Sequence, residues 1–176
     1  MSEKIRFDSL PLSEGIQEAV KEMGFEFASP IQSEAIPFVL EGRDVIGQAQ
    51  TGTGKTAAFG IPMIEHIVPF EKYVQAIILC PTRELAVQVE EQFNALAKNL
   101  DLRMVSLYGG VGMKSQIEAI NQGVDMIVAT PGRFMDIYLK GELVVKQIKT
   151  MVLDEADKML DMGFLDSILE VVDQAP

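Results

Sequence analysis

The sequence predicts an α/β fold with a mostly parallel β-sheet and helices on both of its faces. Short apolar runs rich in Val, Ile and Leu are typical of parallel strands that are buried on both sides. Segments with helical periodicity separate these runs, and such alternation indicates a parallel sheet. The chain of 176 residues has the size of one ordinary domain, and 48% apolar residues suffice for a substantial core.

These patterns predict five strands, each followed by a helix. The predicted strands are Asp44–Gly47, Val74–Cys80, Met104–Leu107, Asp125–Ala129 and Lys149–Leu153. The predicted helices are Thr56–Val68, Arg83–Asn99, Lys114–Gln122, Arg133–Lys140 and a final one from about Phe164 to Val172. Leu85, Val89 and Phe93 recur at helical spacing in the second helix. Pro62 is expected to kink or shorten the first helix.

Two further helices are predicted ahead of the first strand. Ser13 can cap the earlier helix, and Gly24 follows its end. Pro30 stands at the expected first turn of the later helix, which Gly42 ends. The N-terminal part of the chain is therefore expected to be helical.

Charge and composition limit the classes of function. The net charge of −11 argues against broad electrostatic binding of nucleic acid, but it allows local contacts by backbone N–H groups and a few arginines. The longest apolar stretches are far shorter than the roughly 20 residues of a membrane helix, and the N-terminus lacks the apolar core of a signal peptide. The single cysteine, Cys80, excludes an internal disulfide. We expect a soluble, cytoplasmic protein with no membrane partner.

The segment AQTGTGKT is predicted to bind phosphate, because it follows a predicted strand and opens a predicted helix. Its glycines allow successive N–H groups to point at an anion, and the helix N-terminus adds partial positive charge. Lys55 can reach the outer phosphates, and the Thr56 hydroxyl can ligate Mg²⁺. A glycine-rich turn that caps a helix would explain the glycines but not the Lys-Thr pair. The candidate nucleotide-binding residues are Ala49, Gln50, Thr51, Gly52, Thr53, Gly54, Lys55 and Thr56.

A pair of carboxylates forms the second half of this candidate site. The last predicted strand delivers Asp154 and Glu155 to its carboxyl end, where ligands bind in open α/β sheets. Asp154 can hold Mg²⁺, and Glu155 beside it can orient and deprotonate an attacking water. Alternatively, these acidic residues mark a helix start. Together with the phosphate loop and Lys55, they predict a site for nucleoside triphosphate hydrolysis.

The chain resembles the DEAD-box RNA helicases along nearly its whole length. The motif that gives the family its name is present as Asp154, Glu155, Ala156 and Asp157, and the family's phosphate loop also begins with Ala, as at Ala49 here. Other segments that look like family motifs occur in the expected order: Gly24-Phe25 through Pro30-Ile31-Gln32 with Phe7 upstream, Pro81-Thr82-Arg83-Glu84-Leu85-Ala86, Gly109-Gly110 and Thr130-Pro131-Gly132-Arg133.

The resemblance implies the first of two RecA-like domains, with ATP and Mg²⁺ as cofactors. Residues 1–41 would carry the N-terminal helices and the adenine-recognising segment, and residues 42–176 the RecA-like ATP-binding core. The chain stops before the family's Ser-Ala-Thr motif, and the second RecA-like domain, a partner in the family's mechanism, is missing. An arginine from that domain is worth about 10³–10⁵ in rate in related phosphoryl-transfer enzymes. This chain alone is therefore expected to hydrolyse ATP and unwind RNA near background.

Gln32 and Phe25 are the candidates for base recognition. The Gln32 amide carries donor and acceptor groups that can pair with the N6/N7 edge of adenine, which would select ATP over GTP. Phe25 could stack on the base, as the resemblance implies. Both Phe25 and Phe7 could instead be core residues, which is the default for aromatic side chains.

The candidate RNA-facing residues directly follow predicted strands: Pro81, Thr82, Arg83, Gly109, Gly110, Thr130, Pro131, Gly132 and Arg133. Arg83 and Arg133 can bind phosphates with their forked guanidinium groups. None of these residues reads a base edge, so RNA would be bound along its sugar–phosphate backbone without sequence preference. Two alternatives stay open: the glycine pair is an ordinary turn, and Arg133 forms an ion pair with Asp136.

Other functions are consistent with parts of the pattern. A non-catalytic module could bind nucleotide or clamp RNA by occupancy alone, although intact Lys55, Asp154 and Glu155 favour an active parent enzyme. A small-molecule kinase would need an arginine-rich lid, which the sequence does not show. A DNA helicase is disfavoured by Gln32 together with the spelling of the acidic motif.

Overall fold

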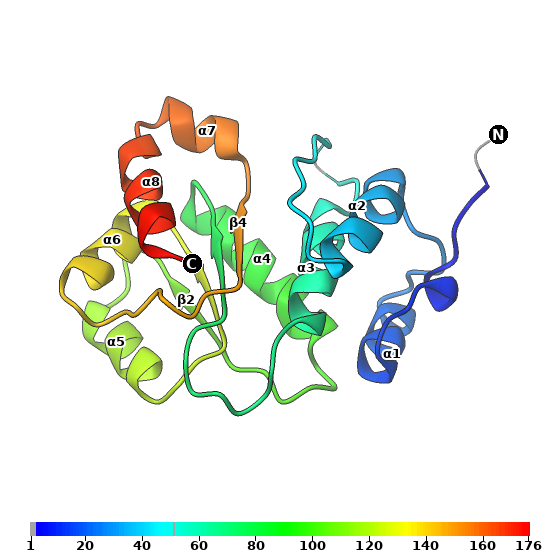
Figure 1. Ribbon diagram of the computed structural model, residues 1–176, viewed down its shortest axis with the longest axis horizontal. Coiled ribbons are helices and arrows are strands. Elements are labelled where there is room, and N and C mark those ends of the chain that lie inside the picture. Colours follow the sequence, from blue (N-terminus) through cyan, green and yellow to red (C-terminus); the bar gives the residue numbers. More distant parts are fainter. Residues whose placement is uncertain (1–2, 51) are drawn as a thin grey trace. The chain divides into compact units, whose positions relative to one another are not determined.

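The computed structural model describes residues 3–50 and 52–176, which form two compact units (Figure 1). The N-terminal unit consists of Met1–Ile67 and Glu91–Asp101. The sheet unit consists of Val68–Glu90 and Leu102–Pro176. Helix α4 (Arg83–Leu96) begins in the sheet unit and ends in the N-terminal unit. The predicted division at residues 41 and 42 follows the sequence motifs and stays a prediction.

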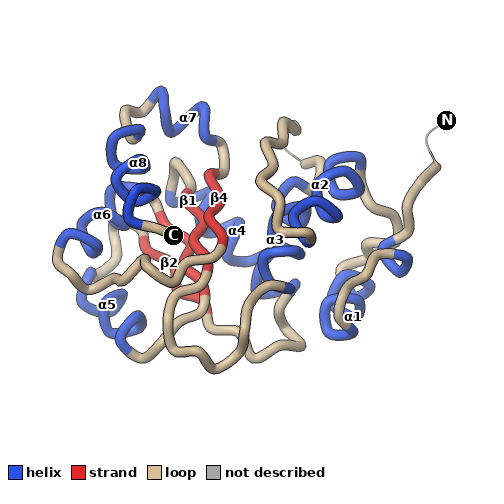
Figure 2. The backbone as a smooth tube through the Cα atoms, viewed as in Figure 1, coloured by secondary structure: helices blue, strands red, loops and turns tan. Residues whose placement is uncertain are grey.

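The sheet unit is built on four parallel strands in the order β2-β3-β1-β4 (Figure 2). An all-parallel sheet confirms the predicted α/β fold. Strand β2 matches its predicted bounds, and the other three are shorter than predicted, although the flanking residues Gln75, Cys80 and Lys149 still form backbone hydrogen bonds to neighbouring strands. The bounds are Ala76–Leu79 for β1, Met104–Leu107 for β2, Met126–Ala129 for β3 and Thr150–Leu153 for β4.

The register of the sheet brings all four strands to an end at the same level. Leu79 of β1 pairs with Ala129 of β3 and with Leu153 of β4, while Leu107 of β2 pairs with Ala129. The segments that follow the strands therefore leave the sheet along one edge. In an open parallel sheet this is the edge at which ligands bind.

Four helices lie around the sheet within this unit: α5 (Met113–Asn121), α6 (Pro131–Leu139), α7 (Ala156–Asp161) and α8 (Leu165–Gln174). Proline as the first residue of α6 suits a position whose N–H needs no helical acceptor. Helix α7 begins directly after Glu155, as the helix-start alternative predicts, so the acidic motif is both a strand end and a helix start. No helix in the described part of the chain has the length and apolar character needed to cross a membrane.

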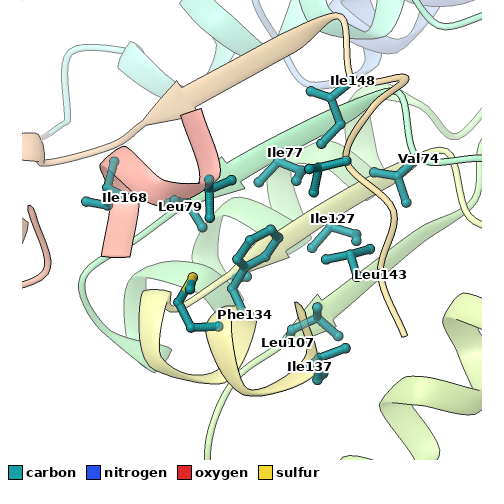
Figure 3. Packing of buried hydrophobic residues seen from close by; sticks show 14 of the residues in the cluster. Val74, Ile77, Leu79, Leu107, Ile127, Phe134, Ile137, Leu143, Ile148 and Ile168 are labelled. Carbon is teal, nitrogen blue, oxygen red and sulfur yellow. The ribbon is translucent and has the colours of Figure 1, made fainter. Parts of the chain in front are cut away.

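The core of the sheet unit lies between the sheet and these helices (Figure 3). Phe134 of α6 is fully buried and lies among Leu79, Ile127 and other apolar side chains from the strands. Complete burial of such a side chain contributes about 1.5–3 kcal/mol to folding. The same packing fixes α6, and with it the segment that connects β3 to α6, against the sheet.

The N-terminal unit is helical. It contains a short 3₁₀ helix at Phe7–Ser9 and the helices α1 (Glu14–Glu22), α2 (Pro30–Leu40) and α3 (Lys55–Glu65). The positions of Ser13 and Pro30 confirm the predicted starts of α1 and α2. Helix α3 continues through Pro62 and ends at Glu65, three residues before the predicted end, so Pro62 shortens the helix only slightly.

The predicted strand at Asp44–Gly47 is wrong. These residues belong to no strand, and Val45 and Ile46 are exposed, with Ile46 accessible over its whole side chain. The apolar run is only two residues long between Asp44 and Gly47, and no strand of the N-terminal unit is described beside it. Without ladder hydrogen bonds or burial, high β-propensity alone does not hold a strand.

Candidate functional site

The phosphate loop leads directly into helix α3. Gly54 is the residue before the helix and has a φ of 81°, and Gly52 has a φ of 84°. These left-handed conformations turn the backbone so that N–H groups of the loop and of the first helical turn can face an anion. The Thr53 hydroxyl donates to the Gln50 carbonyl oxygen at 2.6 Å, which stabilises the turn. The loop residue Thr51 lies outside the described residues.

Lys55 and Thr56 are the first two residues of helix α3, and both are half-buried. This position gives the lysine and the hydroxyl the helix-start context that phosphate binding uses, whereas the strand expected ahead of the loop is not formed. Ala49 is half-buried in the loop ahead of them, and Gln50 is exposed. The N-terminal unit thus brings together all described residues of the candidate phosphate site.

Gln32 connects the base-recognising segment to the phosphate loop. Its side chain is only 4% exposed. The amide Nε2 donates to the Gly54 carbonyl oxygen at 3.1 Å, and Oε1 accepts from the Ser29 N–H at 2.9 Å. Each of these amide groups keeps one further hydrogen-bonding position, and the pairing of Gln32 with adenine stays a prediction.

Gly54 is constrained by Gln32 as well as by its backbone. A Cβ built on Gly54 would fall onto the Gln32 amide and lie 3.3 Å from the Ser29 hydroxyl. By contrast, a Cβ on Gly52 would meet no atom within 4 Å. The two loop glycines therefore differ: Gly52 is needed for its φ alone, and Gly54 is also needed for close approach.

Phe7 and Phe25 form a stacked pair, with ring centroids 5.9 Å apart and an angle of 22° between the ring planes. Phe7 is 2% exposed, and its N–H donates to the Glu26 carbonyl oxygen at 3.1 Å. Phe7 thus packs against the base-recognising segment, as the core alternative predicts. Phe25 is half-buried, and its stacking on a base stays a prediction.

In the sheet unit, four predicted motifs meet at the edge where the strands end. Across the sheet, the order is the glycine pair after β2, the Thr130 segment after β3, the Pro81 segment after β1 and the carboxylates after β4. Pro81 and Pro131 are buried and fix the turns from strand to helix. The Thr82 hydroxyl accepts from the Leu85 N–H at 3.3 Å, in the manner of a helix cap.

Arg83 lies across the glycine turn. Its guanidinium is 5.0 Å from the centroid of the Tyr108 ring, a cation–π contact. Gly110 has a φ of 83°, and a Cβ there would lie 2.7 Å from Arg83 Nη1. Gly109 and Gly110 are exposed and form a turn, as the alternative predicts, and the positive φ of Gly110 favours glycine in it.

Arg133 is bound by residues that follow the glycine pair in the sequence. Its Nη1 donates to the Val111 carbonyl oxygen at 2.9 Å and to Gln116 Oε1 at 3.1 Å. The arginine is therefore bound to two neutral groups, the Val111 carbonyl after the glycine pair and the Gln116 amide of α5, rather than to Asp136. Thr130 is the N-cap of α6, directly after β3, and exposed Gly132 is the second residue of that helix.

The two carboxylates occupy unlike environments. Asp154 is 3% exposed, and its backbone N–H donates to the Leu79 carbonyl oxygen at 2.9 Å, which extends the ladder by one bond. Glu155 is half-buried with φ 53° and ψ 52°. A non-glycine residue in this left-handed region carries strain, which clusters at functional sites.

A sequence model of the family described as DEAD/DEAH box helicase matches residues 29–176 of this chain. The chain belongs to this family. The match includes the phosphate loop, Arg83, the glycine pair, Arg133 and the acidic motif, so the expected family is confirmed.

Relatives of this DEAD/DEAH box chain agree with that assignment. The chain is 48% identical over 172 residues to an ATP-dependent RNA helicase CshA of Limosilactobacillus reuteri. The match covers 98% of this chain and 35% of the relative. A DEAD-box ATP-dependent RNA helicase CshA of Streptococcus pneumoniae is 45% identical over the same length, with 33% of that relative covered. The chain spans about a third of the length of these relatives.

A solved structure confirms the RecA-like fold of the DEAD/DEAH box chain. The crystal structure of a DEAD box protein from the hyperthermophile Methanococcus jannaschii matches with a TM-score of 0.93 and 39% sequence identity. The match covers 99% of this chain and 48% of the other.

Two residues of the DEAD/DEAH box site were not predicted from the sequence: Tyr108 and Gln116. Tyr108 directly precedes the glycine pair, and this position next to a predicted motif could have indicated a role in the site. Gln116 is buried on α5, where the apolar residues Met113, Ile117 and Ile120 lie at helical spacing. A polar residue within such a stripe is a detectable exception.

Proposed function

We propose that this chain is the ATP-binding half of an ATP-dependent RNA helicase, which couples ATP hydrolysis to RNA binding and duplex unwinding. The observation that supports the proposal is the common level at which the four strands end, because the segments that follow β2, β3 and β1 and the acidic motif then leave the sheet along one edge. The names of the 48% and 45% identical relatives support it. A second RecA-like domain is the proposed partner, and the cytoplasm the proposed location.

In this proposal the loop from Ala49 to Thr56 binds the phosphates of ATP, and Lys55 stabilises the charge that develops on the outer phosphate. Gln32 and Phe25 recognise the adenine. Thr56 and Asp154 would hold Mg²⁺, and their hydroxyl and carboxylate oxygens fit this hard cation, which also takes phosphate oxygens as ligands. Bound Mg²⁺ would neutralise phosphate charge.

Glu155 acts in this proposal as the general base that orients and deprotonates the attacking water. Proton transfer by a positioned side chain typically contributes about 10²–10⁴-fold. The arginines that complete such sites in the family would come from the second domain. The isolated chain should therefore bind nucleotide but turn it over near background.

The RNA-facing motifs would follow a single strand along the sheet edge. Arg83 and Arg133 provide forked donors for phosphates, Gly110 admits close approach, and Thr130 offers a hydroxyl. None of these groups reads a base edge, so the proposed binding is independent of RNA sequence.

Calorimetric titration of the chain with Mg²⁺-ADP tests the nucleotide part. We expect Lys55→Ala to weaken binding about tenfold or more, because a charge-assisted hydrogen bond is lost. Lys114→Ala is the matched control, because Lys114 is an exposed residue of α5, and this variant should bind ADP like the wild type. Equal ADP affinities of the wild type and Lys55→Ala would contradict the proposal.

Turnover is the second measurement. RNA-stimulated ATP hydrolysis by the 176-residue chain, with Glu155→Gln as the background, should be barely detectable. Turnover by the chain alone at the rate of an intact helicase would contradict its assignment as one half of the enzyme.

A further inference from the structure

The buried amide of Gln116 joins two of the motifs at the sheet edge. Gln116 is 5% exposed on α5. Its Nε2 donates to the Tyr108 carbonyl oxygen at 3.1 Å, and its Oε1 accepts from Arg133 Nη1 at 3.1 Å. One side chain thus holds the backbone ahead of the glycine turn and the arginine of the neighbouring motif.

Arg133 receives its orientation from these contacts. Both Gln116 and the Val111 carbonyl oxygen bind the same nitrogen, Nη1. A guanidinium carries five N–H donors in a fixed plane, so fixing one end directs the remaining donors. Arg133 is therefore oriented before a phosphate binds, and the binding of RNA need not supply the entropy of ordering its side chain.

Arg83 is connected to the same amide through Tyr108. The ring of Tyr108 lies under the Arg83 guanidinium, with 5.0 Å between the guanidinium carbon and the ring centroid. The Tyr108 carbonyl oxygen is the atom that Gln116 holds. The backbone position that sets the ring under Arg83 thus depends on the amide that also binds Arg133.

We propose that Gln116 is a positioning residue that orders Arg133 directly, and Arg83 through Tyr108, for contact with the RNA backbone. The inference rests on the proposed RNA-binding function and deepens it. Neither amide group of Gln116 is replaceable by an apolar atom, because the Tyr108 carbonyl and the Arg133 guanidinium would each lose a partner.

A double-mutant cycle on the full chain tests this role by anisotropy with a fluorescein-labelled single-stranded oligouridylate. Gln116→Met removes the amide and nearly conserves volume, and we expect RNA affinity to fall roughly three- to tenfold, the cost of ordering one long side chain. On an Arg133→Ala background the same change should have a smaller effect, because only the route through Tyr108 to Arg83 remains. Gln122→Met, at the exposed end of α5, is the control and should bind normally.

Three outcomes separate the inference from the function on which it rests. If Arg133→Ala leaves RNA affinity unchanged, the proposed RNA role of Arg133 falls, and the inference falls with it. If Arg133→Ala weakens binding but Gln116→Met does not, the inference alone is overturned. Equal losses from Gln116→Met with and without Arg133 would also overturn it, because none of the loss would then depend on the contact between Gln116 and Arg133.

A measurement on the wild-type chain needs no variant to fold. The ¹⁵N relaxation order parameter of Arg133 Nε should match a rigid site, about 0.85, in the absence of RNA. A value below about 0.6, typical of flexible groups, would overturn the inference.

Discussion

The sheet unit and the N-terminal unit position their candidate site residues by different means. In the sheet unit, each motif follows a strand whose neighbours hold it in register, and the strands end at one level. In the N-terminal unit, the segment ahead of the phosphate loop forms no strand, and a side-chain amide, that of Gln32, bonds to the loop at Gly54. A motif supported by a sheet depends on the core, whereas a motif supported by a side chain depends on single residues.

This contrast predicts that substitutions in the core lower the stability of the sheet unit most. Phe134→Ala should lower the free energy of unfolding by about 3–5 kcal/mol, because it removes a fully buried ring from beneath the sheet. Urea denaturation measures the change. Leu139→Ala at the end of the same helix, where the side chain is 68% exposed, should change stability by less than about 0.5 kcal/mol. Similar losses at both positions would contradict the described packing.

The phosphate loop should instead respond to a single methyl group. Gly54→Ala should cost about 2 kcal/mol or more and strongly weaken nucleotide binding, because the added Cβ displaces the Gln32 amide as well as straining φ. Gly52→Ala should cost only about 1 kcal/mol, for φ alone. Thermal unfolding and ADP titration compare the pair. Equal effects would break the argument for close approach at Gly54.

At the strained turn of Glu155 we expect a smaller effect on stability, and one in which glycine is more stable than alanine. Glu155→Gly should be about 1 kcal/mol more stable than Glu155→Ala, since glycine adopts the left-handed conformation without penalty. At Glu170, exposed inside α8, glycine should be less stable than alanine by a similar amount. The same sign at both positions, from chemical denaturation, would exclude the left-handed turn.

The smallest expected effect lies on the surface of the N-terminal unit. Arg6 bonds to Asp8 at 3.1 Å, and this contact holds the pKa of the Asp8 carboxyl below its ordinary value. Any stabilisation from the pair is present above the ordinary pKa and is lost as the pH falls through the lowered one. An NMR titration of Arg6→Ala should show the Asp8 pKa returned towards its ordinary value. An unchanged pKa would mean that the pair is not formed in solution.

The sequence predicted the features that depend on local pattern. The bounds of β2 and the starts of α1 and α2 follow from periodicity and caps, and the order of the motifs was recognised through the family resemblance. Helix α7 was anticipated only as an alternative, because its six residues are too few for a periodic signal. The strand at Asp44–Gly47 was wrong, because a strand also needs a neighbour, which propensity does not report.

The side-chain contacts within the site could not be predicted from the sequence. Gln32 was predicted from its motif to pair with adenine, but its bond to Gly54 crosses 22 positions and leaves no local pattern. The partnership of Gln116 with Tyr108 and Arg133 likewise depends on the packing of α5 beside β2. Such bonds become visible only when the elements are placed in three dimensions.

The relative affinity of the chain for ATP and GTP tests the central claim most directly. A bidentate contact to adenine discriminates by about 1–3 kcal/mol, so wild-type chain should bind ATP roughly 5- to 150-fold more tightly than GTP. Gln32→Ala should remove this preference. Equal affinity of the wild type for the two nucleotides would contradict the assignment of Gln32 and of the ATP site.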